Sequence, residues 1–319
     1  MMPKKVSLKE SITHHLHDGR SAKGVFAMRP EILIKNLIAS FIIFGGFAWL
    51  TRVLLWRDRV AILLYHDPDP ATLDRHLTYL RTICDLIPFE ALNDSSTGRP
   101  RAIITFDDGH AGNAALLPIF IKHNVRPTIF LCSRIVGHRR SHWWLHPSVE
   151  RMGVERLKRL TNSQRLLELK TAGFVQESED QATGLTVEQI ETMRPFVDFQ
   201  AHTRFHPILT RCDDEECENE IADSKDEVAV LVKGECTRFA FPNGNYGARE
   251  IEFVKAAGFK TARTCDAGWN DSRTDPFRLR TIIITDDASP SWFAAQLTGI
   301  PLFLRYLRGG GWAGRFPQF

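Results

Sequence analysis

The sequence predicts an α/β fold of parallel strands, close to a (β/α) barrel. From about residue 60 onward, short runs of β-branched and apolar residues alternate with longer amphipathic stretches, and this alternation is typical of a parallel sheet. The short runs are apolar almost throughout, so both faces of the sheet should be covered. Seven such units are more than most doubly wound sheets require, and no G-x-G-x-x-G or G-x-x-x-x-G-K-[ST] motif supports a nucleotide-binding fold.

The elements follow in order along the chain. The strands predicted from apolar runs are Val60 to Tyr65, Ala102 to Phe106, Pro127 to Cys132, Val197 to Ala201, Thr237 to Phe241, Phe259 to Arg263 and Leu279 to Thr285. The helices predicted between them are Ala71 to Cys84, Ala114 to His123, a segment within Ser148 to Ala172, Asp213 to Val232 and Ala248 to Ala257.

Length and charge define the expected domain organisation. The 319 residues allow one barrel domain over residues 60–298, a basic N-terminal extension over 1–59 and a C-terminal tail over 299–319. A net charge of +3 is too small to indicate a nucleic-acid partner. Residues 1–59 hold ten Lys or Arg and four Asp or Glu, a balance of +6, which leaves −3 for the rest. The extension therefore favours contact with a membrane surface.

An uncharged stretch runs from Leu37 to Thr51, fifteen residues, whereas a perpendicular helical span needs about twenty. If Lys35, Arg52 and Arg57 extend toward the lipid headgroups, the apolar helix could reach from about residue 32 to 55 and just cross. Two interpretations stay open: a helix that packs on the barrel or dips into the membrane, and a true span with the barrel outside. A cleavable signal peptide of the usual form is not indicated.

Six cysteines with no C-x-x-C pair predict mostly reduced thiols. This pattern slightly favours the cytoplasmic face of a membrane, although an even number of cysteines also permits disulfides.

Residues that could carry chemistry follow several of the predicted strands, where barrel enzymes place their active sites. Asp108, His202 and His206 form a set of one carboxylate and two imidazoles, which suits Zn²⁺, Co²⁺, Ni²⁺ or Fe²⁺. Asp107 lies beside Asp108, and two adjacent like charges are readily explained if one binds a cation and the other handles protons. A turn that caps the following helix would also explain Asp-Asp-Gly, but it would not account for the histidines.

Four short stretches resemble motifs of the polysaccharide deacetylases, also called the NodB homology or carbohydrate esterase family 4: TFDDG (105–109), HTRFH (202–206), FAFPNG (239–244) and LLYH (63–66). The resemblance covers roughly residues 60–298 and implies a distorted (β/α)7–8 barrel. It also implies removal of an acetyl or other acyl group from an N-acetylated sugar with one divalent metal ion, most often zinc. Asp107 would be the base, Asp108, His202 and His206 the ligands, and a backbone N–H near Asn243 would hold the oxyanion.

The sequence departs from this family pattern at two positions. Ala240 replaces the arginine that usually orients the base, and Arg280, at the start of the last strand, is our candidate substitute. No histidine follows His206, so the usual late acid is missing. His66 is the candidate acid, because it ends the first strand and an imidazole suits the task, and His110 is the second choice.

Two adjacent tryptophans, Trp143 and Trp144, are candidates for a sugar-stacking platform, although burial of a long connection would explain them equally well.

The expected function is therefore a metal-dependent deacetylase of a polysaccharide or lipid-linked glycan, with membrane contact through residues 32–55 and no nucleic-acid partner. One alternative is a non-catalytic carbohydrate-binding protein on the same scaffold, which the missing arginine and late histidine would suit. A glycosyltransferase with a D-x-D-like site is another, but it has no need of H-x-x-x-H.

Overall fold

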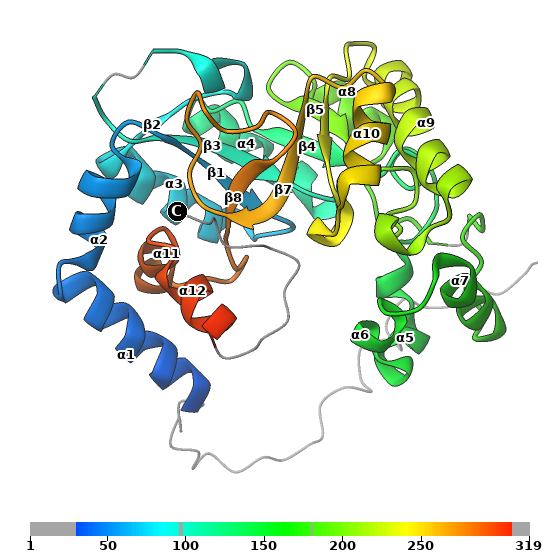
Figure 1. Ribbon diagram of the computed structural model, residues 1–319, viewed down its shortest axis with the longest axis horizontal. Helices are drawn as coiled ribbons and strands as arrows, with labels where there is room; N and C mark the ends of the chain where they lie inside the picture. Colours follow the sequence, from blue (N-terminus) through cyan, green and yellow to red (C-terminus); the bar gives the residue numbers. More distant parts are fainter. Residues whose placement is uncertain (1–29, 96–97, 180, 308–319) are drawn as a thin grey trace, which may run out of the picture.

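A computed structural model describes residues 30–95, 98–179 and 181–307. Its centre is a closed ring of seven parallel strands (Figure 1). In ring order the strands are β1 (Val60–Tyr65), β3 (Arg101–Phe106), β4 (Thr128–Leu131), β5 (Asp198–Ala201), β6 (Arg238–Ala240), β7 (Thr261–Ala267) and β8 (Leu279–Ile283), which returns to β1. The short β2 (Asp85–Leu86) pairs with β3 outside the ring and was not predicted. The predicted barrel is confirmed.

The ring is distorted because its strands pair over unequal lengths. β1 and β3 pair along six residues, from Val60 opposite Arg101 to Tyr65 opposite Phe106. In contrast, β5 and β6 pair only at Ala201 and Phe239, and the register of β7 against β8 shifts between Arg263 and Ala267.

Alternation along the strands produces two apolar layers. Val60, Ile62, Ile103 and Phe130 belong to a small cluster that fills the ring, and the residues between them contribute to the larger cluster under the surrounding helices. Every side chain of β1 and β3 is buried. This is why the strands are apolar on both faces in the sequence.

Helices surround the ring. They are α3 (Pro70–Ile83), α4 (Leu117–Lys122) after a 3₁₀ turn (Ala111–Leu116), α8 (Val187–Met193), α9 (Asp214–Val232), α10 (Ala248–Ala256) and α11 (Pro290–Gln296). α3 begins as its sequence indicates, because the Asp69 side chain accepts a hydrogen bond from the Thr72 amide and Pro70 occupies the first helical position. The helices α8 and α11 were not predicted.

In the long connection from β4 to β5, three short helices before α8 replace the one predicted within 148–172. These are α5 (Pro147–Met152), α6 (Val154–Leu157) and α7 (Asn162–Thr171). They pack around a separate small core that includes Trp143, Leu157 and Leu169. In Figure 1 this group lies below the ring, on the right.

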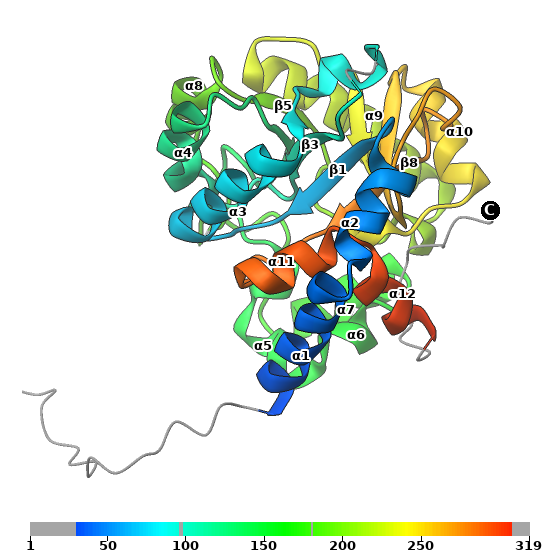
Figure 2. The ribbon, with the colours of Figure 1, turned by 90° about the vertical axis from the view of Figure 1, so that its left-hand side faces the viewer.

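The N-terminal apolar segment is a bent pair of helices, not the single helix expected over residues 32–55. α1 (Pro30–Phe44) and α2 (Phe47–Thr51) are separated at Gly45 and Gly46, where Gly46 has a φ of 76°, and a π-helical turn (Arg52–Trp56) continues α2. Figure 2 shows α1 beside α11 and α12 (Ile300–Leu307). In the described part of the chain no single helix is long and apolar enough to cross a membrane. Taken together, the two helices of the bent pair are long and apolar enough to cross, judged by length and composition alone.

The C-terminal segment expected as a tail over 299–319 begins with α12. Residues 1–29 and 308–319 lie outside the described residues.

Candidate metal and catalytic centre

The candidate site lies at the carboxyl ends of the strands. Asp107 and Asp108 follow β3 directly, and His202 follows β5. Sharp turns follow both strands: Asp108 and Gly109 have φ values of 71° and 67°, and His206 has one of 57°. Gly109 is required at its position, because an added Cβ would lie 2.7 Å from the Leu131 side chain.

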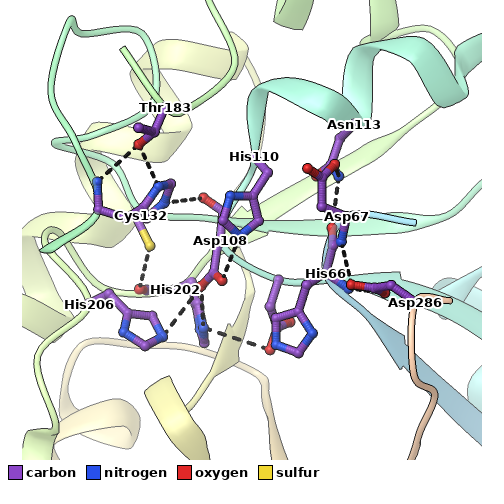
Figure 3. Close-up of polar contacts among 12 residues, drawn as sticks. His66, Asp67, Asp108, His110, Asn113, Cys132, Thr183, His202, His206 and Asp286 are labelled. Atoms are coloured by element: carbon purple, nitrogen blue, oxygen red, sulfur yellow. Dashed lines mark hydrogen bonds and ion pairs between the residues drawn. The ribbon is translucent and has the colours of Figure 1, made fainter. Parts of the chain in front are cut away.

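Asp108, His202 and His206 are brought together from chain positions almost a hundred residues apart (Figure 3). Asp108 Oδ1 lies 3.5 Å from His202 Nε2 and 3.3 Å from His206 Nε2. One ligand atom from each of the three lies within 4.8 Å of the others, and all three residues are buried. Among the described residues, Asp108 Oδ1 has no hydrogen-bond donor. A buried carboxylate oxygen without a donor is costly unless a cation compensates it, so the trio fits a divalent metal ion.

Hydrogen bonding sets the tautomer of His202, and burial acts on both imidazoles. His202 Nδ1 lies 2.8 Å from the Ala240 carbonyl oxygen, which can only accept, so Nδ1 carries the hydrogen and Nε2 presents its lone pair toward Asp108. Burial lowers the pKa of His202 and lowers that of His206 further, despite the opposing charge of the nearby carboxylates. Both shifts favour the neutral imidazole, the form that binds metals.

Glu220, on α9, holds the loop that carries the second histidine. Its Oε2 accepts hydrogen bonds from the backbone amides of Arg204 at 2.8 Å and Phe205 at 3.0 Å. Burial raises the pKa of Glu220 to about 7, although these two bonds oppose the shift. The sequence did not identify Glu220, because nothing distinguishes it there from the other acidic residues of its helix.

Asp107 is paired with a buried arginine from the opposite side of the ring. Arg263 Nη2 lies 2.5 Å from both carboxylate oxygens of Asp107, and its guanidinium stacks 5.1 Å from the Phe130 ring centroid. Arg263 lies at the end of a strand predicted from the sequence and was not among the predicted site residues. That strand, FKTAR, also contains Lys260, so charge alone did not distinguish Arg263.

Arg280, the arginine named from the sequence, does not lie beside Asp107. It is near the start of β8, where Asn270 bonds to its backbone, and Asn270 pairs in turn with Val60 at the start of β1. This is the amino-terminal end of the ring, opposite the site. The partner of Asp107 is therefore Arg263 and not Arg280.

His66 and His110 occupy different positions relative to the trio. His66 follows β1, is partly exposed, and projects its ring to the same side as His202 and His206 (Figure 3). Its backbone amide donates to Asp286 Oδ1 at 3.1 Å. His110 Nε2 lies 3.1 Å from Asp108 Oδ2, so His110 occupies the second oxygen of the candidate ligand. Burial alone would lower the pKa of His110, but the bond to Asp108 and its charge outweigh that effect and raise it.

The two adjacent tryptophans have different environments. Trp143 is 2% exposed, donates its indole N–H to the His206 carbonyl at 3.2 Å and lies under the guanidinium of Arg165. It is therefore a core residue of the α5–α7 group and cannot serve as a stacking platform. Trp144 is partly exposed, and the centroid of its ring lies 4.4 Å from that of the His206 ring. Only Trp144 remains a candidate for contact with a sugar.

His142 and Asn243 complete the surroundings of the site. His142, which the sequence analysis did not single out, lies between the Asp108 carbonyl, 3.3 Å from Nε2, and the Thr183 hydroxyl, 2.7 Å from Nδ1. Burial lowers its pKa to about 4. Asn243 lies in the turn after β6 with a φ of 55°, and its side chain donates to Asn245.

A parallel barrel with a buried Asp-His-His trio and an adjacent carboxylate is the arrangement of a metal-dependent hydrolase. The sequence matches the polysaccharide deacetylase family over residues 94–262, just over half of the chain. The chain belongs to this family, and membership implies an acetylated polysaccharide as substrate.

Individual relatives are distant. "Putative polysaccharide deacetylase YxkH" of Bacillus subtilis (strain 168) is 20% identical over 255 residues, which are 75% of this chain and 76% of that protein. Among solved structures, the Streptococcus pyogenes deacetylase PplD, in complex with acetate, superposes with a TM-score of 0.55 at 19% identity, over 75% of this chain and 97% of that one. IcaB from Ammonifex degensii superposes with a TM-score of 0.57 at 17% identity, over 77% of this chain and 97% of that one. At these identities the likeness supports the fold.

Proposed function

We propose that this protein removes the acetyl group from an N-acetylated sugar of a polysaccharide or lipid-linked glycan. The observation that carries the proposal is Asp108 Oδ1, a buried oxygen without a donor that faces the Nε2 atoms of two neutral histidines. A divalent ion, zinc first by its preference for imidazole and carboxylate ligands, fits this set.

Asp107 is the proposed base. A metal ion held by Asp108, His202 and His206 would supply Lewis acidity to the acyl carbonyl and to the attacking water. Asp107 accepts the proton of that water, and it is adjacent in sequence to the ligand that defines the site. Arg263 is its positioning residue, because one guanidinium nitrogen contacts both carboxylate oxygens and limits rotation of the carboxylate.

The remaining roles follow from position at the mouth of the ring. His66 is the proposed acid for the leaving amine, because its ring is partly exposed on the side of the trio, whereas His110 is bound to Asp108. A backbone N–H near Asn243 is the proposed oxyanion donor, and Trp144 the proposed sugar contact.

Arg263 also bears on the non-catalytic alternative. One reason for that alternative was the arginine missing from the FAFPNG stretch, where Ala240 stands in its place. Since Arg263 supplies a guanidinium to Asp107 from the next strand, this departure no longer favours loss of activity. A pure binding protein would have no use for a base held in this way.

The test is acetate release from N-acetylated oligosaccharides by the zinc-loaded protein. We expect Asp107→Asn to retain stoichiometric zinc and lose activity by at least about 10²-fold, and His206→Ala to lose both zinc and activity. Full activity in either variant would contradict the mechanism. Stoichiometric zinc without acetate release from any glycan in a panel, soluble or lipid-linked, would favour the binding protein.

A further inference from the structure

The exposed apolar side chains are concentrated in the N-terminal helix pair. Eight of the fifteen large hydrophobic residues exposed in the described chain lie between residues 37 and 54: Leu37, Phe41, Phe44, Phe47, Trp49, Leu50, Val53 and Leu54. Phe44 is 88% exposed and Phe41 67%. The other seven are spread over the rest of the molecule. We call the set of eight the apolar face. Such a concentration of exposed apolar side chains, in which the Phe41 and Phe47 ring centroids are 5.6 Å apart, indicates an interaction site.

The opposite side of the same segment is fixed to the barrel at both ends. Ala39 and Ile42 on α1 pack against Ala295 on α11. At the other end Trp56 is fully buried, and its indole N–H donates to the Arg101 carbonyl at 2.8 Å. The segment is therefore two-sided, with one side already occupied by protein.

This attachment argues against a membrane span. Leu37–Phe44 and Phe47–Trp56 are bent by 63° relative to each other. The fifteen residues of α1 extend about 22 Å and Phe47–Trp56 about 15 Å, whereas the hydrocarbon core of a bilayer is about 30 Å thick, so neither arm crosses alone. To span, α1 would have to leave α11 and straighten at Gly45 and Gly46. Lying in the membrane surface requires neither change.

Charge indicates the kind of surface. Arg52 is the only charged residue between 37 and 54, and the first 59 residues carry +6. Directly beside Val53 and Leu54 lies a polar cavity of about 320 Å³, lined by three arginines, Arg57, Arg59 and Arg273, and by two carboxylates, Asp58 and Asp271. Arg59 and Arg273 share Asp271, while Arg57 is exposed and makes no ion pair with any described residue. Cations beside an apolar face match anionic lipid headgroups next to acyl chains.

We propose that the apolar face lies in the surface of an anionic membrane as an interfacial anchor, with Arg57 and its neighbours at the phosphate level. α11, on which α1 packs, begins four residues after Asp286, and Asp286 binds the backbone amides of His66 and Asp67 at the mouth of the ring. In Figures 1 and 2, α1 lies at the same end of the ring as α5 and α6, which follow β4. The anchor therefore lies along the side of the ring, with α1 at the mouth and Arg57 and Arg59, beside the start of β1, at the opposite end. This part rests on the proposed function and favours a lipid-linked or membrane-proximal glycan as substrate.

The binding test uses the full chain and flotation with vesicles of phosphatidylcholine alone or mixed with phosphatidylglycerol. We expect binding to the mixed vesicles at low salt and at least tenfold weaker binding for the triple variant Phe41→Ser, Phe44→Ser, Trp49→Ser. The matched control removes three exposed apolar side chains elsewhere and should bind as the parent does. Its substitutions are Leu167→Ser, Phe196→Ser and Val230→Ser. Equal binding of the two triple variants, or no preference for the anionic vesicles, would overturn the proposal.

A labelling experiment separates an interfacial anchor from a span. All six native cysteines are buried and unpaired, so cysteines introduced as Lys5→Cys and Lys170→Cys report their own accessibility. A membrane-impermeant maleimide added outside preformed vesicles should label both positions after the protein binds. When the protein is instead reconstituted into vesicles from detergent, every molecule that is labelled at one position should also be labelled at the other. Protection of one position alone would show a span and overturn the proposal. Neither experiment needs substrate, so failure of the proposed deacetylation would be seen separately.

Discussion

Arg263 and Asp107 form a buried ion pair across the barrel, in which Nη2 lies 2.5 Å from both carboxylate oxygens although 156 residues separate the two in the chain. The arginine side chain is fully buried and the carboxylate side chain 5% exposed. Neither charge can regain water if the other is removed, so the pair connects the stability of the barrel to the geometry of the proposed base.

Replacing Arg263 with Met should lower both activity and stability. Asp107 would remain as a buried charge without its partner, and breaking such a pair costs about 3–5 kcal/mol. We expect a kcat about 10²-fold lower with KM changed less than threefold, because only the base loses its orientation. Zinc content should stay stoichiometric. Urea unfolding of Arg263→Met and of the double variant Asp107→Asn, Arg263→Met should show recovery of stability in the double variant. Equal losses of unfolding free energy in the single and the double variant would show that the unpaired Asp107 charge does not cause the destabilisation.

Removing the metal should lower stability as well as activity. A ligand that binds only the folded state adds about 2.7 kcal/mol to the unfolding free energy at one hundred times its dissociation constant. We expect zinc to raise the melting temperature of the parent and EDTA to reverse the rise, while His206→Ala shows neither change. Trp144→Phe, a substitution next to the trio, should keep the full zinc-dependent rise. A rise of parental size in His206→Ala would exclude His206 as a ligand.

The two tryptophans should respond differently to substitution. Trp143→Ala should destabilise the fold by about 3–5 kcal/mol, because it empties a packed position in the α5–α7 core. Trp144→Ala should leave the unfolding free energy within about 1 kcal/mol and raise KM for a glycan. Denaturant unfolding and steady-state kinetics on the two variants check this. A Trp144→Ala variant with parental KM would remove Trp144 from the substrate site.

Glu220 should make stability fall as pH rises. Its pKa is about 7 in the folded protein against an ordinary value of 4.5, so between these values the folded state binds more protons than the unfolded state. The unfolding free energy should therefore decrease with rising pH across this range, by on the order of 3 kcal/mol at 1.36 kcal/mol per pKa unit. Glu220→Gln keeps an acceptor for the two amides but cannot ionise.

The pH effect is best measured as a difference between Glu220→Gln and the parent in metal-free buffer, from pH 4 to 8. The parent should lose stability relative to the variant as pH rises from about 5 to 7. Parallel curves of unfolding free energy against pH for the parent and the variant would show that Glu220 does not titrate in this range.

Much of the fold could be predicted from local patterns. The seven ring strands are short apolar runs, and Asp107, Asp108, His202 and His206 stand immediately after them, so the topology of a barrel brings these residues to one end. The short β2 and helices α8 and α11 lack a clear hydrophobic period or length of their own. The break in the N-terminal helix falls at Gly45 and Gly46, a dipeptide that is a turn signal in the sequence itself.

The partners of the site residues were harder to predict, because they depend on which side chains point into the ring. Arg263 and Arg280 are both arginines within predicted strands. Arg263 pairs with Leu279, the residue before Arg280, so the two arginines differ in the face of the sheet they are on, and only Arg263 points into the ring toward Asp107. In the same way, adjacent Trp143 and Trp144 differ only in their orientation, toward a core or toward His206.

The unusual backbone at the mouth of the ring has a consequence for protein engineering. Of the six non-glycine residues with positive φ in the described chain, four are Asp108, Thr203, His206 and Asn243. Such conformations cost about 1–3 kcal/mol each, less for Asp, Asn and His. A transplant of this centre into another barrel would therefore have to carry whole loops, because ligand side chains grafted onto relaxed turns would point elsewhere. Conversely, a screen for thermostability alone would tend to select glycine at Thr203, and so remove the hydroxyl that accepts a hydrogen bond from the His206 amide and holds that ligand's loop.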